Sequence, residues 1–353
     1  MKRMYGEPFP SLAHRYIYSF MIATPEKANP ECGVDEDSQR QFQSFLRSML
    51  EILYSDPALI GMPLLEDKLA GQEEKSELQQ MRSKIETKWN QFIDFLVKLG
   101  VVGQVEGESL LVSGSAVKIK PRIGQMEAVG LQVQVQGTDY RITCPDFPCM
   151  FAAYVYHATR QRKPGRVARR SFAMGYSGWR TETALDCYGS FYPDSSFLKA
   201  VEEYCQTNGY TCLNDEWDNR TVRWEKDYKQ SKRIMFSVFS EIWRQYQVMY
   251  TIRVSDFHAV FAEFESMSDG LREMIMEKAS KCSGCKYCIQ TDKTGSKPLA
   301  VSHLQHRGVT KAVCSYYPFW ALHEVSSERA EQLIELMQIA DRVLTAKYGL
   351  RRK

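Results

Sequence analysis

Apolar residues recur at helical spacing in three long stretches of the sequence. In the first of these, Phe42, Phe45, Leu46 and Leu53 fall on one face of a helix. The second is followed by Gly100, and glycine commonly ends helices. The third follows Ser326 and Ser327, and serine is a good helix cap. The pattern therefore predicts helices over residues 36–54, 73–99 and 328–348.

Shorter stretches have the alternation or the apolar runs of β-strands, separated by turn residues. Residues 101–112 contain the turn EGE between two apolar runs, and residues 131–135 and 140–143 predict a hairpin across Gly137. Three further strands are predicted later in the chain. Because the middle one is apolar on both faces, we expect it to be central in its sheet. These strands are residues 221–228, 234–243 and 248–254.

Capping and breaking residues delimit the remaining helices. Pro145 is expected to open a helix that ends near Arg160, since proline suits the first helical position. Residues 195–208, 255–265 and 268–279 each begin with serine or aspartate caps. The order of helix, three-stranded meander and helices predicts an α+β fold of helices plus small antiparallel sheets, and not a doubly wound sheet.

A basic run, RQRKPGRVARR at residues 160–170, is the best candidate for a linker between domains. We expect an N-terminal domain over residues 1–163 and a C-terminal domain over residues 164–353, which contains the meander, a cysteine module at about 280–320 and a closing helix. A contact with nucleic-acid phosphates is the alternative, although the run lacks interleaved aromatic residues. The basic side chains are Arg160, Arg162, Lys163, Arg166, Arg169 and Arg170.

Composition narrows the class of protein. Hydrophobic residues make up 44% and charged residues 25% of the 353 residues, which is typical of a soluble globular protein. The net charge of +3 does not indicate a nucleic-acid or membrane partner. No apolar run approaches the length of a membrane span, and the first residues lack the apolar region of a signal peptide. We therefore expect a cytoplasmic protein.

Four of the ten cysteines cluster between Lys281 and Ser315. Thiolates bind zinc and iron–sulfur clusters because they are soft, charged ligands, and Cys-x-x-Cys lets two sulfurs of one turn reach one ion. A hairpin over residues 291–313 would bring the last cysteine back to the first three. The predicted metal ligands are Cys282, Cys285, Cys288 and Cys314.

Zinc with four cysteines is the usual structural site, so we expect zinc. The spacing of the first three cysteines also suits a 4Fe-4S cluster, but the ferredoxin pattern breaks after Cys288, and Ser315 rather than proline follows Cys314. A site without metal is the third alternative. His303 or His306 could replace one sulfur. Because the segment is poor in large aliphatic residues, a bound ion would supply folding energy that its core cannot.

The tetrapeptide DKTG, residues 292–295, occurs in the phosphorylated loop of ion-pumping ATPases. Position 294 is threonine, where the related phosphatase motif has a second aspartate, and no membrane helices are predicted. We interpret DKTG as a turn, because aspartate accepts backbone hydrogen bonds and glycine takes positive φ.

Complete catalytic motifs are missing from the sequence, so enzymatic activity is uncertain and not favoured. Cys144 and Cys149 are separated by four residues, whereas thioredoxin-like pairs are separated by two. The aromatic segment 172–192 could line a ligand pocket with Arg180, Glu182 and Asp186 as its polar groups. The favoured function is binding of a small ligand or partner, with a structural zinc site; the alternatives are an iron–sulfur redox enzyme and a nucleic-acid-binding regulator.

The stretch CSGCKYCIQTDKTG, with Cys314 and YYPFW after it, resembles the C-terminal end of a family of uncharacterised bacterial proteins, mainly from anaerobic Gram-positive bacteria. In that family CxxCxYCxQTDKTG is followed by a later cysteine near a Phe-Pro pair and by a closing helix. Residues 126–160 are similar to the middle of such proteins. The resemblance implies a metal-binding tail and no reaction. This sequence departs from the pattern at Ser315, where proline is expected.

Overall fold

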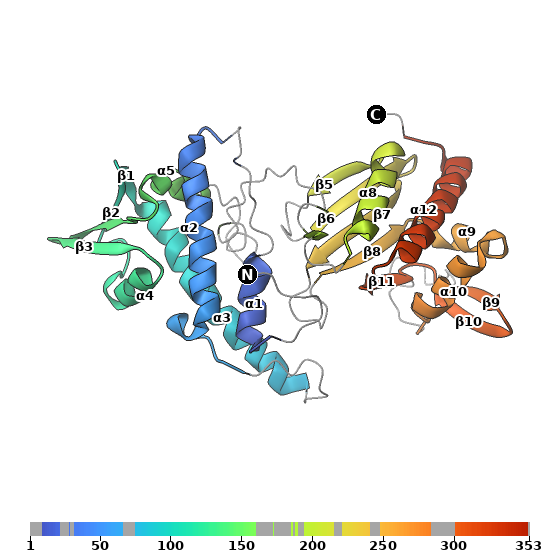
Figure 1. Cartoon of the computed structure of the whole chain (residues 1–353), viewed down its shortest axis with the longest axis horizontal. Helices are drawn as coiled ribbons and strands as arrows, with labels where there is room; N and C mark the ends of the chain where they lie inside the picture. The colour runs from blue at the N-terminus through green and yellow to red at the C-terminus, as the bar shows by residue number, and fades with distance from the viewer. Residues whose placement is uncertain are drawn as a thin grey trace, which may run out of the picture.

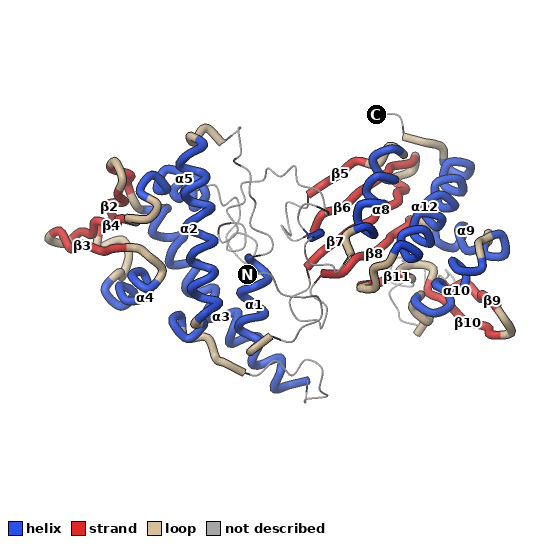
Figure 2. Tube along the Cα trace, in the orientation of Figure 1, coloured by secondary structure: helices blue, strands red, loops and turns tan. Residues whose placement is uncertain are grey.

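The computed structural model describes residues 9–21, 28, 32–65, 75–159, 172, 185, 188–189, 194–214, 221–240, 248–283 and 301–351. Figure 1 shows the arrangement of the helices and strands, and Figure 2 shows which segments are helix, strand and loop. Each described sheet is antiparallel and helices pack against its flanks, so the fold is α+β, as the sequence predicts.

The first half of the described chain combines helices with a small sheet in the order β1-β2-β4-β3. Two of its strand pairs are the predicted hairpins, which turn at Gly107 and Gly137. Asp35 caps the first long helix by accepting a hydrogen bond from Ser38 N–H. The elements are α1 (Leu12–Met21), α2 (Glu36–Ser55), η1 (Pro57–Ile60), α3 (Lys75–Val102), β1 (Gln104–Glu106), β2 (Ser109–Ser113), η2 (Lys120–Arg122), α4 (Ile123–Ala128), β3 (Gln132–Gln136), β4 (Asp139–Thr143), η3 (Pro148–Met150) and α5 (Phe151–Thr159).

Two predicted helix ends in this half are wrong. α3 continues through Gly100 to Val102, because Gly100 does not adopt the positive φ of a glycine that ends a helix. Its missing side chain instead lets α5 pack closely against α3. The helix predicted to open at Pro145 begins later, as a short turn that starts at Pro148 and leads into α5. Phe147, with φ −139° and ψ 63°, is not helical, and a residue before proline is disfavoured in the helical region.

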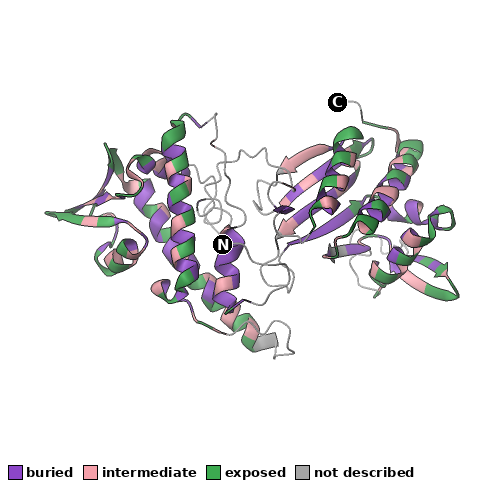
Figure 3. Cartoon of the chain, viewed as in Figure 1, coloured by how far each residue is buried: buried purple, intermediate pink, exposed green. Residues whose placement is uncertain are grey.

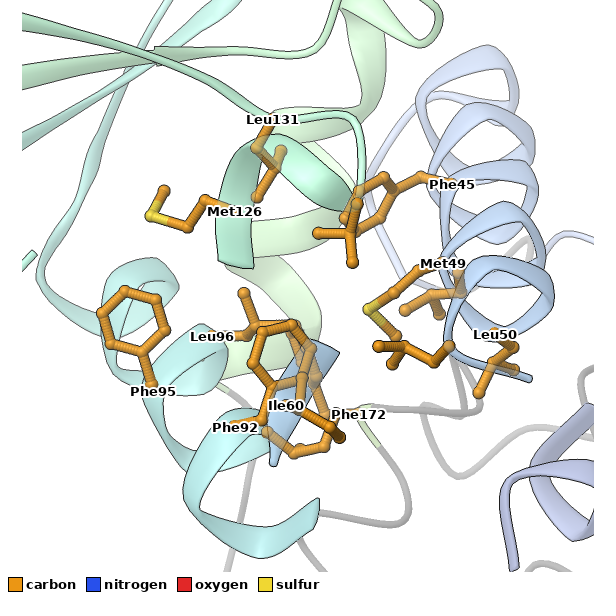
Figure 4. Close-up of a cluster of buried hydrophobic side chains, with 14 of the residues drawn as sticks. Phe45, Met49, Leu50, Ile60, Phe92, Phe95, Leu96, Met126, Leu131 and Phe172 are labelled. Atoms are coloured by element: carbon orange, nitrogen blue, oxygen red, sulfur yellow. The ribbon is translucent and has the colours of Figure 1, made fainter. Parts of the chain in front are cut away.

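A cluster of buried hydrophobic side chains from α1 to α5 forms the first core. Figure 4 shows side chains of α2, α3 and α4 meeting there, together with Phe172. The ring centroid of Phe172 lies 5.7 Å from that of Phe42 and 5.3 Å from that of Tyr154. The predicted domain boundary at residue 163 falls outside the described residues, so the division into two domains stays a prediction.

The second half contains a sheet in the order β11-β8-β7-β6-β5. β7 is therefore central, as its apolar character predicts. Ser268 and Ser326 cap α10 and α12 through their hydroxyl groups, while α9 ends at Phe261, earlier than predicted. The elements are α8 (Ser196–Thr207), β5 (Thr211–Asn214), β6 (Thr221–Tyr228), β7 (Lys232–Ser240), β8 (Val248–Val254), α9 (Phe257–Phe261), η5 (Phe264–Ser266), α10 (Asp269–Lys278), β9 (Val301–His306), β10 (Val309–Cys314), β11 (Phe319–Leu322) and α12 (Ser327–Tyr348).

A second core lies between this sheet and the helices α8 and α12, which cover one of its faces (Figure 1). In Figure 3, buried and exposed residues alternate along α12 as they do on an amphipathic helix, and its buried residues include Leu333, Met337 and Leu344. The hairpin of β9 and β10 lies beside α9 and α10 and forms a separate two-stranded sheet. This hairpin carries the last of the predicted metal ligands. No helix in the described part of the chain is long and apolar enough to cross a membrane.

Candidate metal centre

The predicted cysteine module begins on a short β-ladder between the residues after α10 and the strand β10. Lys281 and Val313 form an antiparallel bridge. On either side of it, Cys282 N–H donates to Ala312 O and Cys314 N–H donates to Ser280 O, both at 2.9 Å. Because β10 also pairs with β9, three extended segments lie side by side. The ladder thus joins two cysteines that are distant in sequence.

The ladder places both thiols on the same face. Successive side chains of an extended strand point to opposite faces, and residues paired across strands point to the same one. Cys282 is paired with Ala312, and Cys314 follows Ala312 by two residues, so their side chains project together. The opposite face carries Val313, Ser302 and Leu304, which are buried. The thiols therefore occupy the more exposed face of the ladder.

Cys282 and Cys314 are diagonal neighbours on the ladder. This arrangement bears on whether a disulfide or a shared metal ion could join them. Diagonal neighbours have Cα atoms about 7–8 Å apart. A disulfide needs a Cα separation of about 4.4–6.8 Å. A zinc ion about 2.3 Å from each sulfur bridges a wider gap than a direct bond. The spacing typical of diagonal neighbours therefore suits a shared metal ion better than a disulfide.

A backbone N–H group contacts the sulfur of Cys314. Tyr317 N–H donates a hydrogen bond to Cys314 Sγ at 3.4 Å. A donor to the charged form of a group stabilises that form. The guanidinium carbon of Arg253 lies 4.2 Å from the centroid of the Tyr317 ring. The thiolate is the form of cysteine that binds metals.

The two candidate histidines lie on opposite faces of the hairpin. His303 pairs with Ala312 and so shares the face of the thiols, where it is exposed. The side chain of His306 is only 8% exposed, and its Nε2 atom lies 3.5 Å from Asp269 Oδ1. Its ring packs edge-on against Phe264, on the other face. Of the two, the ladder therefore favours only His303 as a neighbour of the thiols.

A small hydrogen-bond network holds Ser315, the residue after Cys314. Ser315 Oγ lies 2.6 Å from Ser302 Oγ, and His258 Nδ1 lies 3.2 Å from Ser302 Oγ. Both serines are buried, with exposed fractions of 6% and 7%. Sequence reasoning missed this network, because serines in a polar segment give no signal of burial. Recognising residues 301–306 as a strand would have placed Ser302 on the inner face.

A groove of about 510 Å³ lies beside Lys281, between α10 and β10. Lys311 reaches across it and donates to Met276 O at 2.6 Å, near the carbonyl end of α10. Burial lowers the pKa of Lys311. Acidic and basic side chains both line the groove, so its charge does not select a ligand.

Several predicted site residues lie outside the described residues. They include Cys285 and Cys288, the DKTG turn and the basic run 160–170. Within the part of the chain that the structure describes, no group of three or more histidine, cysteine, aspartate or glutamate side chains is arranged to hold a metal. The site with four cysteines therefore stays a prediction, supported by the placement of two of its members. The polar groups of the predicted pocket, Arg180, Glu182 and Asp186, also lie outside these residues.

The described aromatic residues of the predicted pocket are divided between the two cores: Phe172 belongs to the first, and Tyr188, Trp224 and Tyr250 belong to the second. Trp224 Nε1 donates to Glu202 Oε1 at 2.8 Å, and Tyr250 packs against Phe197 at 4.8 Å between ring centroids. Both aromatic side chains are buried.

The two cysteines that flank Pro148 have different surroundings. Cys144 is buried, and burial raises the pKa of its thiol to about 11, whereas Cys149 is exposed. A thiol with a raised pKa is a poor nucleophile, so Cys144 does not have the character of a redox-active cysteine.

A scan against models of protein families, a search of curated proteins and a search of solved structures each found no match to this chain. The resemblance of the cysteine module to a bacterial family therefore stays a prediction.

Proposed function

We propose that the chain is a cytoplasmic protein that binds a small ligand or a partner, and that a structural zinc ion holds its C-terminal part together. Cys282, Cys285, Cys288 and Cys314 are the proposed ligands. The observation that supports the proposal is the ladder at Lys281 and Val313, which projects Cys282 and Cys314 from neighbouring strands onto one face. A reducing compartment keeps such thiols available as ligands.

Four thiolates complete the tetrahedral shell of zinc and leave no position for water or substrate, which is the arrangement of structural sites. The ion would connect the residues after α10 to β10, beside the bridge between Lys281 and Val313. A single bridge closes a long loop at a considerable cost in chain entropy. Metal binding would offset that cost, because ligands that are absent from the unfolded state turn binding energy into folding energy.

Metal analysis of anaerobically purified protein tests the proposal. We expect one zinc ion per chain and no visible colour, because zinc has no electronic transitions in the visible range. A brown protein with broad visible absorption would show that an iron–sulfur cluster, and not zinc, is bound by these cysteines. Protein without metal after purification and after zinc addition would overturn the site altogether.

Substitution of the two described ligands gives a second test. Cys282→Ser and Cys314→Ser should each lose bound zinc and unfold at a lower denaturant concentration. A chelator should destabilise the unaltered protein much more than either variant. Cys149→Ser is the matched control, because Cys149 is exposed and lies far from the ladder in sequence. If Cys282→Ser keeps its zinc and its full stability, the structural role assigned here is wrong.

A further inference from the structure

The strand β3 has a sequence that reads the same in both directions, Gln-Val-Gln-Val-Gln. It stands last in the strand order β1-β2-β4-β3 and pairs with β4 along one side. In the part of the chain that the structure describes, no strand pairs with its other side. Figure 1 shows β3 projecting at the outer end of its sheet. Four of its five residues are exposed, and Val133 is half-buried.

The hydrogen-bond pattern shows which backbone groups face the free edge. Gly114 N–H donates to Thr138 O at 3.1 Å, so Thr138 points toward β2. Backbone groups of an antiparallel strand alternate in direction from one residue to the next, so Asp139 and Arg141 point toward β3. Their partners Gln136 and Gln134 use their own N–H and C=O groups in the hairpin.

The backbone groups of the residues that alternate with Gln134 and Gln136 therefore point away from β4. Val133 and Val135 direct one N–H and one C=O each away from β4, toward the free edge. These groups form a regular row without a ladder partner among the described strands. Such a row is a template for another strand.

A second copy of β3 fits this edge. Turned antiparallel about Gln134, it places Val133 of each copy opposite Val135 of the other. Each of these two pairs exchanges two hydrogen bonds, so all the free N–H and C=O groups of both strands find partners. The middle glutamines lie opposite each other on the twofold axis. Because β3 contains no charged residue, no like charges meet across the axis.

The side chains of β3 are also complementary to themselves. Val135 is 56% exposed, and pairing would set it beside Val133 of the second copy, on the face of the sheet where their partners Tyr140 and Ile142 are buried. The glutamine side chains would meet on the other side. Sheets with exposed edges usually carry lysine, proline or a bulge that blocks such pairing. β3 has none of these within its bounds.

We propose that β3 is the interface of a twofold-symmetric homodimer in which the two four-stranded sheets join into one continuous sheet. This proposal does not depend on the metal site. A strand of this length extends about 17 Å, and edge pairing alone buries less than the roughly 1,200 Å² of standard interfaces. The dimer is therefore weak, and its population depends strongly on protein concentration.

Sedimentation of the full chain over a range from low micromolar to millimolar concentration tests the proposal. The mean mass should rise toward twice that of the chain. Gln134→Lys places two ammonium groups opposite each other at the axis, where cross-strand Cβ atoms are about 5 Å apart. This variant should remain monomeric throughout the range. Gln134→Glu should do the same, because it places two carboxylates opposite each other at the axis.

An equal mixture of Gln134→Lys and Gln134→Glu separates a lost interface from a folding defect. Opposite charges at the axis should restore the dimer and make it tighter than that of the unaltered chain, which a folding defect could not produce. Val135→Pro is a second blocking variant, because it removes an N–H that faces the free edge and not the ladder with β4. Gln104→Lys, at the other edge of the sheet, is the control and should dimerise normally. The proposal fails if the unaltered chain stays monomeric throughout, or if the mixture does.

Discussion

Gly100 of α3 lies so close to Ala158 of α5 that a Cβ atom added to the glycine would be 2.5 Å from the Cβ of the alanine. Tyr154 also faces this position, and a carbon of its ring would lie 2.9 Å from the added atom. The hydroxyl of Tyr154 donates to Leu96 O at 2.6 Å, one turn earlier on α3. The two helices therefore pack at a distance that only glycine permits.

We predict that Gly100→Ala destabilises the protein by about 1–3 kcal/mol, because extra volume in a packed core forces neighbours to move. Intrinsic helix propensity acts in the opposite direction by about 1 kcal/mol. Chemical denaturation measures the difference. Gly124→Ala in α4 is the matched control, since an added Cβ there meets no atom within 4 Å, and it should be neutral or stabilising. Equal effects of the two changes would contradict the packing argument.

The same glycine shows what the sequence could not predict. Helical spacing correctly predicted α2, α12 and most of α3, because one apolar stripe per helix faces a core. A glycine after such a stripe usually marks its end, and only the position of α5 shows that Gly100 has a packing role. α1 was missed for a related reason. It is buried on most sides, with Ser19 and Arg15 among its buried residues, so it lacks a polar face.

The candidate metal centre was predictable only in part. Cysteine spacing named the ligands, but a spacing does not say which face of a strand each side chain occupies. Alternation along 301–306 would have separated His303 from His306, had that stretch been recognised as a strand. The bridge at Lys281 joins segments distant in sequence, and no local pattern predicts such a pairing.

Asp256 connects the start of α9 to the end of α12, and its charge should stabilise the fold. Its carboxylate accepts hydrogen bonds from Ala259 N–H at 3.1 Å, Tyr348 Oη at 2.6 Å and Lys347 Nζ at 2.8 Å. Burial acts to raise the pKa of Asp256, but these hydrogen bonds outweigh it and hold the pKa below its usual value.

We predict that Asp256→Asn lowers the free energy of unfolding by about 1–2 kcal/mol at neutral pH, since hydrogen bonds to a charged group are lost. A carboxyl whose pKa is depressed in the folded state stabilises the fold above its unfolded pKa, near 3.9. That contribution disappears as the pH falls through the folded pKa. Denaturation at pH 7 and near pH 3 should therefore show a difference between the two proteins that shrinks in acid.

The control for this prediction is Asp227→Asn, because the Asp227 side chain is 47% exposed and lies 3.9 Å from Arg233. Exposed ion pairs contribute little, so its effect should be small at both pH values. A loss for Asp256→Asn that stays constant down to pH 3 would show that the charge is not the cause.

The buried pair of Ser302 and Ser315 should behave as one unit. We predict that Ser302→Ala and Ser315→Ala each cost about 1–2 kcal/mol, because each leaves the other hydroxyl buried with one fewer partner. The double variant should cost less than the sum of the two, with a coupling of about 1 kcal/mol. A double-mutant cycle by chemical denaturation measures this coupling. Additive losses would mean that the 2.6 Å contact contributes nothing to stability.

The five-stranded sheet is assembled out of the order in which its strands are synthesised. β5 to β8 are neighbours both in sequence and in space, but β11 pairs with β8 only after α9, α10 and the β9–β10 hairpin have been made. α12, which covers the sheet, follows later still. On the ribosome, the nascent chain therefore displays the unpaired edge of β8, and an apolar sheet face that α8 covers without α12, while the intervening residues are translated. Chaperone binding at that stage would protect it from aggregation.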